Sequence, residues 1–302
     1  MSVISNLLPS QTAKSRDLDI CVHGTPKAQQ SLGRPPYLTC GDDDTVWAEY
    51  YRVQEGYLFR LIDLSDFIIS SDGRSCVSHA VPGLDAETLD HIYRQQVRPL
   101  LWNRQGRLIF HASCVNIAGS TYAFMGESGL GKSTLATAFA QQGYPFLCDD
   151  GLLIEAAGSG YLAYPNDASI RLWHESGDAL LTSEHKCAAP ISYTDKLRVL
   201  AASNLPHCDK PVPLKGVFFL ERQGVENLSI RKLTGAEKHV NWANSNFILD
   251  VWDKASTRLN FDKTAQLADQ IPSYSLDYPR SFAQVEALVH NIVKFIEKEK
   301  LK

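Results

Sequence analysis

Apolar and polar residues alternate in short runs through the first third of the chain, and glycine, aspartate and serine separate the runs. Alternation with a period of two is typical of strands that bury one face. The runs with this pattern are residues 45–53, 57–62, 67–70 and 76–80. Residues 19–23 can add a first edge strand. We therefore predict an antiparallel sheet in the N-terminal part of the chain.

The period then changes to that of a helix. Asp85 is placed to cap a helix that runs to about Trp102, and apolar residues recur on one face of it: Leu89, Ile92, Tyr93 and Val97. Farther on, short apolar runs predict strands at residues 122–125, 144–148, 152–155, 161–164 and 217–220. A helix over residues 134–142 separates the first two of these strands. Residues 183–213, rich in Pro, Ala, His and Ser, are typical of a long loop.

The last part of the chain predicts helices at residues 235–252, 261–270 and 281–300, with a short strand at 274–276. The final helix carries an apolar stripe, which consists of Val285, Leu288, Val289, Ile292 and Phe295. Such a stripe belongs either to the core or to an interface, and the second option leaves room for a homo-oligomer. The chain as a whole predicts an α/β fold with an N-terminal antiparallel β-rich domain and C-terminal helices.

We place the domain boundary at residue 104. Residues 1–104 form an N-terminal β-rich accessory domain, whose first 35 residues are poor in apolar clusters and are expected to be flexible in part. This region holds no set of catalytic residues. Residues 105–302 form the catalytic domain and include the C-terminal helices.

A glycine-rich stretch at residues 126–133 fits the pattern G-x-x-x-x-G-K-[ST] without a mismatch. It follows a predicted strand and opens a predicted helix, which is the context that makes the pattern a phosphate-binding P-loop rather than a simple turn. Backbone N–H groups of such a loop point at an anion, and the helix adds its positive end. The predicted nucleotide-binding residues are Gly126, Glu127, Ser128, Gly129, Leu130, Gly131, Lys132, Ser133 and Thr134.

Two side chains of this loop can bind ligands in addition to the backbone N–H groups. Lys132 offers a mobile positive charge to the β- and γ-phosphates of ATP. Ser133 offers a hydroxyl to Mg²⁺, which takes few protein ligands and keeps several waters. The loop therefore predicts ATP and Mg²⁺ as cofactors.

Asp149 and Asp150 follow the next predicted strand, seventeen positions after Lys132. One helix and a short turn span that distance, so the pair can return to the phosphate end of the loop. One carboxylate can then hold Mg²⁺ and the other can accept a proton from an attacking hydroxyl. Asp-Asp-Gly is also common turn chemistry. His111 begins the hairpin that leads into the loop and can lie near the phosphates, although a lone histidine is more often structural.

The composition argues against two classes of partner, nucleic acid and membrane. The 302 residues are 44% apolar and 21% charged with a net charge of −4, which does not favour a nucleic-acid partner. No apolar run reaches the roughly 18 residues of a membrane span, and the first residues do not resemble a signal peptide. Seven cysteines stand singly without a C-x-x-C pair. These features predict reduced thiols in a cytoplasmic protein that binds no membrane.

The segment from His111 to Glu155 resembles the catalytic core of HPr serine kinase. The likeness rests on His111 with Ile117, the P-loop, the helix that ends at Gly143, and the aspartate pair; a weaker likeness continues through residues 164–173, 195–199 and 218–222. The layout is closer to the HPr-kinase-like group that includes kinases found beside lasso-peptide gene sets. The resemblance implies a mixed-sheet P-loop core of the HPr kinase/PEP carboxykinase type.

The resemblance also implies roles. It implies a kinase that moves the γ-phosphate of ATP to a serine of a peptide or protein, such as a lasso-peptide precursor. Ser133 and Asp149 would hold Mg²⁺, Asp150 would be the base, and His111 would orient the transferring group. Residues 151–158 lack the Glu-x-Arg-Gly stretch of HPr kinase, so the resemblance does not extend to phosphorolysis or to HPr as the substrate.

Three cations remain as candidate contacts to substrate or phosphate: Arg171, Lys196 and Arg198. A surface ion pair would explain Arg171 better than a contact to the nucleotide, and a solvated strand face would explain Lys196 and Arg198 equally well. The P-loop alone is also compatible with a nucleotide-hydrolysing switch, a nucleotide sensor without catalysis, or a small-molecule kinase.

The loop yields a first prediction. Replacing Lys132 by alanine removes a charge that stabilises both bound ATP and the transition state. Because phosphoryl transfer depends mostly on positioning and charge neutralisation, we expect Lys132→Ala to lose at least about a hundredfold in kcat/KM, or about 2.7 kcal/mol. Steady-state kinetics with Mg-ATP measures this, and near-normal turnover would contradict a phosphate site at the loop.

Overall fold

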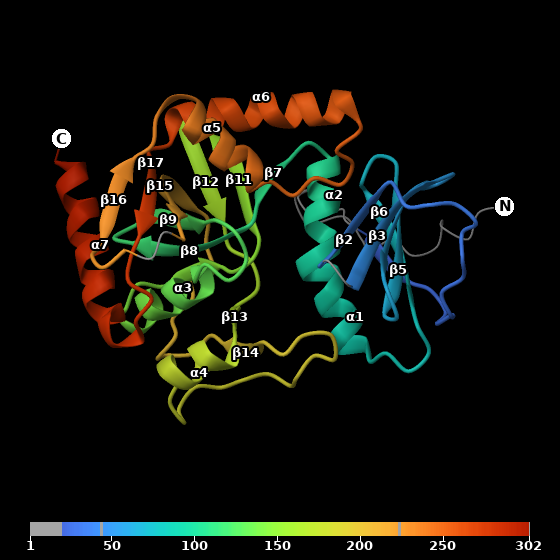
Figure 1. Ribbon diagram of the computed structural model, residues 1–302, viewed down its shortest axis with the longest axis horizontal. Coiled ribbons are helices and arrows are strands. Elements are labelled where there is room, and N and C mark those ends of the chain that lie inside the picture. The colour runs from blue at the N-terminus through green and yellow to red at the C-terminus, as the bar shows by residue number, and fades with distance from the viewer. Residues whose placement is uncertain (1–19, 43–44, 223–224, 302) are drawn as a thin grey trace, which may run out of the picture.

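The N-terminal unit, residues 20–104, is built around one six-stranded sheet. The structure is a computed structural model that describes residues 20–42, 45–222 and 225–301. The strand order is β1-β6-β5-β4-β3-β2 (Figure 1). The strands are β1 (Ile20–His23), β2 (Leu38–Asp42), β3 (Thr45–Val53), β4 (Gly56–Leu61), β5 (Ser65–Ser70) and β6 (Ser75–Ala80).

The predicted strands are confirmed, except that β1 pairs with β6 in parallel, so the sheet is not wholly antiparallel. The predicted flexibility of residues 1–35 falls in large part on residues 1–19, which lie outside the described residues.

One long helical segment covers this sheet. It consists of α1 (Ala86–Ile92), a π-helical stretch η2 (Tyr93–Val97) and α2 (Arg98–Arg104). The predicted cap is confirmed, because the Asp85 carboxylate accepts a hydrogen bond from the backbone N–H of Thr88 at 2.7 Å. Apolar residues of the helix and the sheet pack together in one core that includes Phe59, Phe67 and Ile92.

The larger unit, residues 105–301, contains a nine-stranded mixed sheet. Seven strands follow the order β10-β8-β9-β15-β12-β11-β7, and β17 joins β15 in parallel and carries β16 at its other side. Their bounds are β7 (Leu108–Phe110), β8 (Ala112–Ile117), β9 (Ser120–Met125), β10 (Phe146–Cys148), β11 (Leu152–Ala157), β12 (Gly160–Tyr164), β15 (Val212–Leu220), β16 (Ser229–Lys232) and β17 (Ser273–Asp277). A separate two-stranded sheet pairs β13 (Ser169–Leu172) with β14 (Leu197–Leu200).

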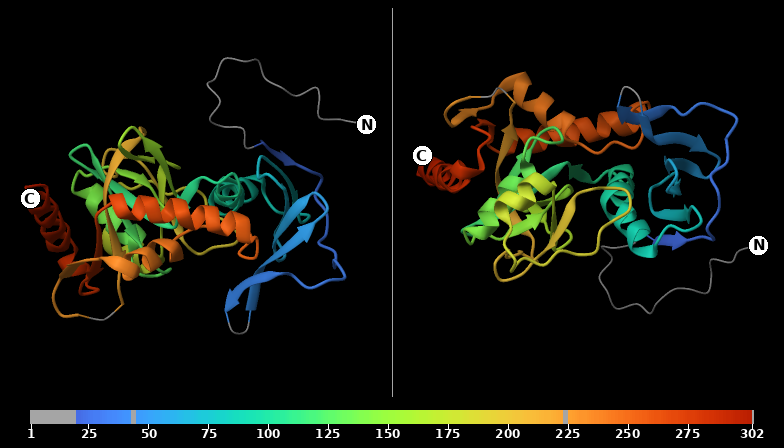
Figure 2. Two further views of the ribbon diagram at one scale, coloured as in Figure 1. Left: turned by 90° about the horizontal axis from the view of Figure 1, so that it is seen from above. Right: turned by 60° about the horizontal axis from the view of Figure 1, so that its bottom comes forward.

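Helices cover both faces of the central strands. Neighbouring side chains of β9 and β15 point to opposite faces, so Phe124 and Phe218 join a core with α3 (Lys132–Gln141) and α7 (Val285–Lys300). Met125 and Phe219 join a second core on the other face, with Trp242 of α5 (Gly235–Asn244). α6 (Lys254–Gln270) lies beside α5 and extends toward the N-terminal unit (Figures 1 and 2). The remaining helices are α4 (His174–Leu180) and the 3₁₀ turn η3 (Phe282–Gln284).

The stripe on the last helix is core, because Leu288, Val289 and Ile292 are buried against the face of the sheet that carries α3. The predicted helix over 235–252 is wrong in its second half. α5 ends at Asn244, since Asn246 bridges to Phe110 and the chain continues along β7.

Two further boundaries differ from the sequence prediction. The helix predicted at 261–270 begins earlier, because the Asp253 carboxylate caps α6 by accepting from the N–H groups of Ala255 and Ser256. The segment 183–213 is not a single loop, because it contains β14, which pairs with β13, and the first residues of β15.

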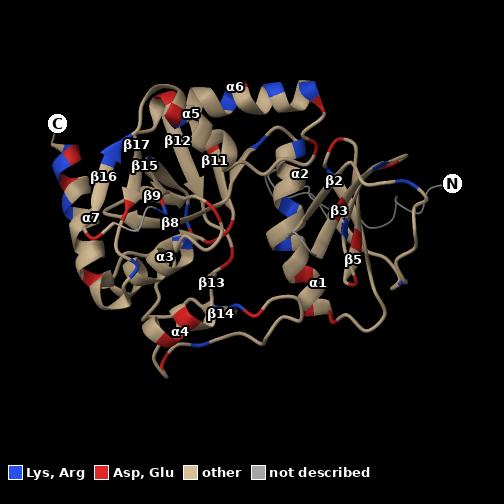
Figure 3. Ribbon diagram, in the orientation of Figure 1, with Lys and Arg blue, Asp and Glu red and all other residues tan. Residues whose placement is uncertain are grey.

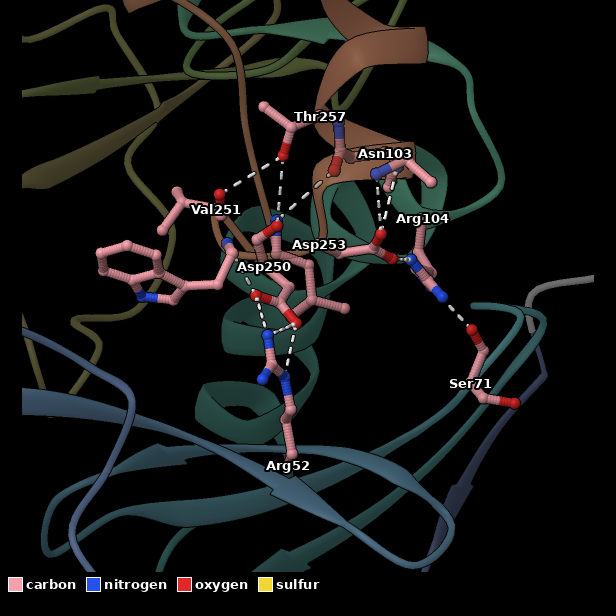
Figure 4. Close-up of polar contacts among 12 residues, drawn as sticks. Arg52, Ser71, Asn103, Arg104, Asp250, Val251, Asp253 and Thr257 are labelled. Carbon is pink, nitrogen blue, oxygen red and sulfur yellow. Dashed lines mark hydrogen bonds and ion pairs between the residues drawn. The ribbon is translucent and has the colours of Figure 1, made fainter.

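Ion pairs join the two units on one side of the molecule. Arg52 of β3 donates to both carboxylate oxygens of Asp250, at 2.8 and 2.9 Å (Figure 4). Arg104 of α2 donates to Asp253 at 2.6 Å and to the Ser71 carbonyl at 2.7 Å. The Asp253 carboxylate therefore both caps α6 and fixes that helix to α2.

Apolar contacts join the two units as well. Ile109, Leu153, Phe247 and Leu249 of the larger unit are buried in the same cluster as the N-terminal sheet and its helix. Separating the units would expose this shared surface to water, which is unfavourable. No helix among residues 20–42, 45–222 and 225–301 is long and apolar enough to cross a membrane.

The interface between the units predicts a pH dependence of stability. His91 of α1 is 1% exposed, and burial, with Arg171, Arg198 and Arg94 nearby, lowers its pKa from the ordinary 6.5 to about 3. Unfolding below pH 6.5 therefore takes up a proton that the folded state excludes. This contribution to stability is present above pH 6.5 and is lost as the pH falls toward 3. From pH 7 to pH 5 the loss should be about 2 kcal/mol.

Urea unfolding of the wild type and of His91→Gln at both pH values measures this effect. The variant should lose less stability on acidification, by about 2 kcal/mol. His290→Gln is the matched control, because His290 is exposed on α7. An equal loss in the wild type and in His91→Gln would contradict the assignment of a neutral buried His91.

Candidate functional site

The glycine-rich loop joins the end of β9 to the start of α3. Its glycines adopt backbone conformations that other residues avoid, with φ of +138° at Gly126, +81° at Gly129 and +92° at Gly131. At Gly131 a side chain is also excluded by space, because a Cβ atom would lie 2.8 Å from the Tyr278 hydroxyl. The first N–H groups of α3 have no partner within the helix, as at every helix start, so this end of the helix suits an anion.

Lys132 lies inside the turn of the loop. Its ammonium group donates to the carbonyls of Gly126 and Glu127, both at 2.8 Å, and the residue is 8% exposed. Burial lowers the pKa of Lys132, and Asp150 and Asp149 oppose that shift. A phosphate group at the loop can replace the two neutral carbonyls with a charged partner, which forms the stronger hydrogen bond.

Asp149 is the most constrained polar residue of the site. It is 4% exposed and accepts three hydrogen bonds: from the Ser113 hydroxyl at 2.5 Å, the Ser133 hydroxyl at 2.8 Å and the Arg171 backbone N–H at 2.9 Å. Burial raises the pKa of Asp149, and the neighbouring charge of Asp150 adds to the shift. The aspartate therefore returns to the loop, as its spacing from Lys132 predicted.

The Asp150 carboxylate has other partners than the Asp149 carboxylate. Its φ of +60° places it in the left-handed region, where aspartate is tolerated better than most residues. The carboxylate forms an ion pair with the Arg171 guanidinium. Burial disfavours the charged form, but Arg171, Lys196 and Lys132 outweigh it and hold the pKa of Asp150 below its ordinary value. Asp150 is therefore a carboxylate at neutral pH.

His111 lies beside this centre but outside the cavity. β7 and β11 pair so that Phe110 faces Leu152, which places His111 next to Asp150 and Gly151 across the sheet. Its ring stacks on Phe247 with 3.4 Å between the centroids. Desolvation lowers the pKa of His111 to about 4, and the charges of Lys132 and Arg171 add to the shift while Asp150 opposes it. The imidazole is therefore neutral at pH 7, and its role in orienting a phosphoryl group stays a prediction.

A cavity of about 280 Å³ opens at the loop. Residues 128–134 of the loop and α3 line it, and so do Asp150, Arg171 and Lys196. Lys196 also lies over the Trp173 ring, 5.1 Å from its centroid. Arg198 is not among the lining residues, since it forms an ion pair with Glu87 of α1. The structure therefore brings two of the three candidate cations to the cavity.

The opposite wall was not foreseen from the sequence. It comes from the segment after β17 and from the start of α7, and its residues are Tyr278, Arg280, Ser281, Phe282, Val285 and Leu288. Arg280 stacks on the Tyr278 ring at 3.9 Å and donates to the Leu130 carbonyl at 2.5 Å. β9, β15 and β17 run in parallel, so their carboxyl ends meet at one edge of the sheet. The parallel pairing of these strands would have predicted this wall, but the sequence pattern does not reveal that pairing.

The donor set around Asp149 fits Mg²⁺. The Ser113 and Ser133 hydroxyls both lie within hydrogen-bond distance of the Asp149 carboxylate. Oxygen is the ligand type that Mg²⁺ prefers, with water in its other positions. No cluster of three His, Cys, Asp or Glu side chains suited to a metal occurs among residues 20–42, 45–222 and 225–301. Ser133 and Asp149 would therefore hold the ion with few protein ligands.

No known family model matches this sequence, and no curated protein matches it. Among solved structures, the HPr(Ser) kinase/phosphatase from Coxiella burnetii is similar over 64% of this chain and 96% of that chain. The sequence identity is 13% and the TM-score is 0.34. A likeness of this size carries no conclusion about activity. The function proposed below therefore rests on the contacts of the site.

Because Asp149 and Asp150 have different partners, we expect their replacement to impair different steps, Mg²⁺ binding and phosphoryl transfer. Asp149→Asn should raise the Mg²⁺ concentration needed for half-maximal turnover, because the amide removes the charge beside Ser133. Asp150→Asn should bind Mg-ATP normally and lose transfer, because an amide does not accept a proton as a carboxylate does. Calorimetry and Mg²⁺ titrations of turnover separate the two variants.

Asp178→Asn is the matched control, because Asp178 is exposed on α4. It should leave the Kd of Mg-ATP and the Mg²⁺ titration unchanged. Normal binding and normal turnover in both site variants would mean that the aspartate pair only shapes the turn.

Proposed function

We propose that this protein is a kinase that transfers the γ-phosphate of Mg-ATP to a hydroxyl group, namely a serine of a peptide or protein. The observation that carries the proposal is the convergence of Lys132, Ser133 and Asp150 on one cavity. Asp149 accepts a hydrogen bond from Ser133, and Arg171 forms an ion pair with Asp150. Phosphoryl transfer needs such a set: a cradle for phosphate, an ion site and a carboxylate near the acceptor.

The loop side of the cavity suits the triphosphate. Backbone N–H groups of residues 129–133 and the Lys132 ammonium would neutralise the phosphates, and Ser133 with Asp149 would hold Mg²⁺. Bound Mg-ATP would supply an activated phosphoryl group whose charge the ion partly neutralises. The Ser113 hydrogen bond fixes the Asp149 carboxylate, so its second oxygen and Ser133 stay oriented in the absence of ligand.

The opposite wall suits the nucleoside. Phe282, Val285 and Leu288 offer apolar surface, and Trp173 offers a ring that is 50% exposed. Ligand pockets typically combine such apolar walls with a few polar groups, and their volumes are roughly 300–1,000 Å³. The cavity of about 280 Å³ is close to the lower end of that range. Arg280 would then stand at the junction of base and phosphates, because it touches the Leu130 carbonyl of the loop.

Asp150 and Arg171 suit the acceptor side. A serine hydroxyl has a pKa far above neutral, so its proton must leave during the reaction. Asp150 is deprotonated at neutral pH and is a weak base, which fits a loose transition state in which the proton moves late. Arg171 lies against Asp150 and can stabilise charge on the transferring group. His111, neutral at pH 7, can orient that group from the solvent side.

A peptide acceptor agrees with the charge of the chain and with the resemblance to kinases of lasso-peptide gene sets. The net charge of −4 gives no reason to expect nucleic acid. Lys196 is exposed to the cavity and can meet a carboxylate of a peptide, such as its C-terminus, whereas Arg198 is engaged with Glu87. We place the reaction in the cytoplasm, where ATP and reduced thiols coexist.

The proposal is tested with [γ-³²P]ATP, Mg²⁺ and serine-containing peptides, lasso-peptide precursors among them. Mass spectrometry should show a gain of one or more phosphates on serine, and replacement of that serine by alanine should abolish the gain. Label that appears only as free phosphate would support a nucleotide-hydrolysing switch, and label on a metabolite but on no peptide would support a small-molecule kinase. Binding of Mg-ATP without any turnover would support a nucleotide sensor without catalysis.

A further inference from the structure

Arg171 is linked to the N-terminal unit through Tyr193. The Arg171 side chain is 10% exposed, and its Nε atom is buried without a hydrogen-bond partner. Next to it lies Tyr193, whose buried hydroxyl interacts with the Arg171 charge. The Tyr193 hydroxyl also shares a hydrogen bond of 2.8 Å with Nδ1 of His91, and the two rings lie 5.8 Å apart. A continuous contact therefore runs from α1 to the aspartate pair.

The strand that carries Arg171 is fixed to the same helix at a second point. β13 pairs with β14 so that Arg171 lies opposite Arg198, and Arg198 forms its ion pair with Glu87 of α1. The first turn of α1 thus fixes the partner strand of Arg171. Because both contacts start from α1, a movement of this helix would move Arg171.

The loop before β13 provides a third attachment. Arg98 of α2 donates to Asn166, and Gln95 of η2 donates to Asp167 at 3.0 Å. Arg94 lies 3.5 Å from the same carboxylate. Figure 3 shows basic positions along the helical segment from α1 to α2. Three attachments therefore surround β13, and all three come from residues 87–98.

We propose that α1, η2 and α2 form a splint that positions Arg171 against Asp150, with His91 and Tyr193 as positioning residues. The inference rests on the proposed phosphoryl transfer and gives the N-terminal unit a part in it. An arginine side chain has large conformational freedom, and charge stabilisation is effective only when the group is already in place. Burial by Tyr193 and fixation of β13 remove that freedom before the substrate binds.

If these contacts only stabilised the fold, mutations that remove them would have a different effect. They would lower stability and leave the chemistry per folded molecule unchanged. A positioning role acts through Arg171, so the loss caused by a change at Tyr193 must depend on whether Arg171 is present. A double-mutant cycle measures that dependence directly.

The cycle uses Tyr193→Phe, Arg171→Lys and the double variant, with total phosphate release or transfer from [γ-³²P]ATP in Mg²⁺ as the readout. Tyr193→Phe should keep the Kd of Mg-ATP within about twofold and lower kcat roughly tenfold, the effect of about one hydrogen bond. In the Arg171→Lys background the same change should cost less than about twofold. Equal losses in both backgrounds would overturn the proposal.

Two further variants test the hydrogen bond itself. His91→Gln keeps a hydrogen-bonding side chain for the Tyr193 hydroxyl and should retain most of the activity, whereas His91→Leu should match Tyr193→Phe. Tyr144→Phe is the matched control, since Tyr144 packs against Phe139 beside α3. It should not change kcat. Equal kcat values for His91→Gln and His91→Leu would also overturn the proposal.

Hydrogen exchange separates failure of the splint from failure of the kinase proposal. Amides of residues 169–172 should exchange faster in Tyr193→Phe and in His91→Leu than in the wild type or Tyr144→Phe. This readout does not require turnover. If the wild type transfers no phosphate, the kinase proposal fails, and faster exchange still supports the splint. Unchanged exchange in both variants overturns the splint, whether or not the protein transfers phosphate.

Discussion

The site depends on one buried carboxylate. Asp149 is 4% exposed, and its charge is tolerated only because Ser113, Ser133 and the Arg171 backbone donate to it. An unpaired carboxylate at this depth would be strongly unfavourable. These three donors come from β8, α3 and β13, so satisfying one side chain fixes three elements relative to each other. The glycine-rich loop, the aspartate pair and Arg171 are thereby held in one arrangement.

The sheet decides what faces the loop. β9, β15 and β17 are parallel and buried on both faces, which brings their carboxyl ends to one edge. The loop leaves from β9, and the Tyr278–Arg280 wall leaves from β17. The cavity therefore lies where open α/β sheets commonly bind ligands, beyond the carboxyl ends of neighbouring strands.

The N-terminal unit is joined to this arrangement too closely to be a separate appendage. It shares an apolar core with Ile109 and Phe247. Its helical segment contacts β14 through an ion pair, and it contacts Tyr193 and the loop before β13 through hydrogen bonds. A partly exposed ion pair such as that of Arg198 with Glu87 contributes little net stability, because water screens the attraction. The effect of these contacts is on orientation, and the orientation they fix is that of the strand carrying Arg171.

The sequence by itself determined the features that depend on neighbouring residues. The spacing of glycines with Lys132 and Ser133, the cap at Asp85 and the return of Asp149 to the loop all follow from local rules of chain geometry. Tertiary structure alone decided the rest. Arg280 meets Leu130 across 150 positions, and Arg198 meets Glu87 across 111, so no local pattern specifies either contact. α5 ends where Asn246 meets Phe110, because pairing with a distant strand replaced continued helix. Packing between distant segments selects such contacts, and this selection is invisible in the spacing of residues along the chain.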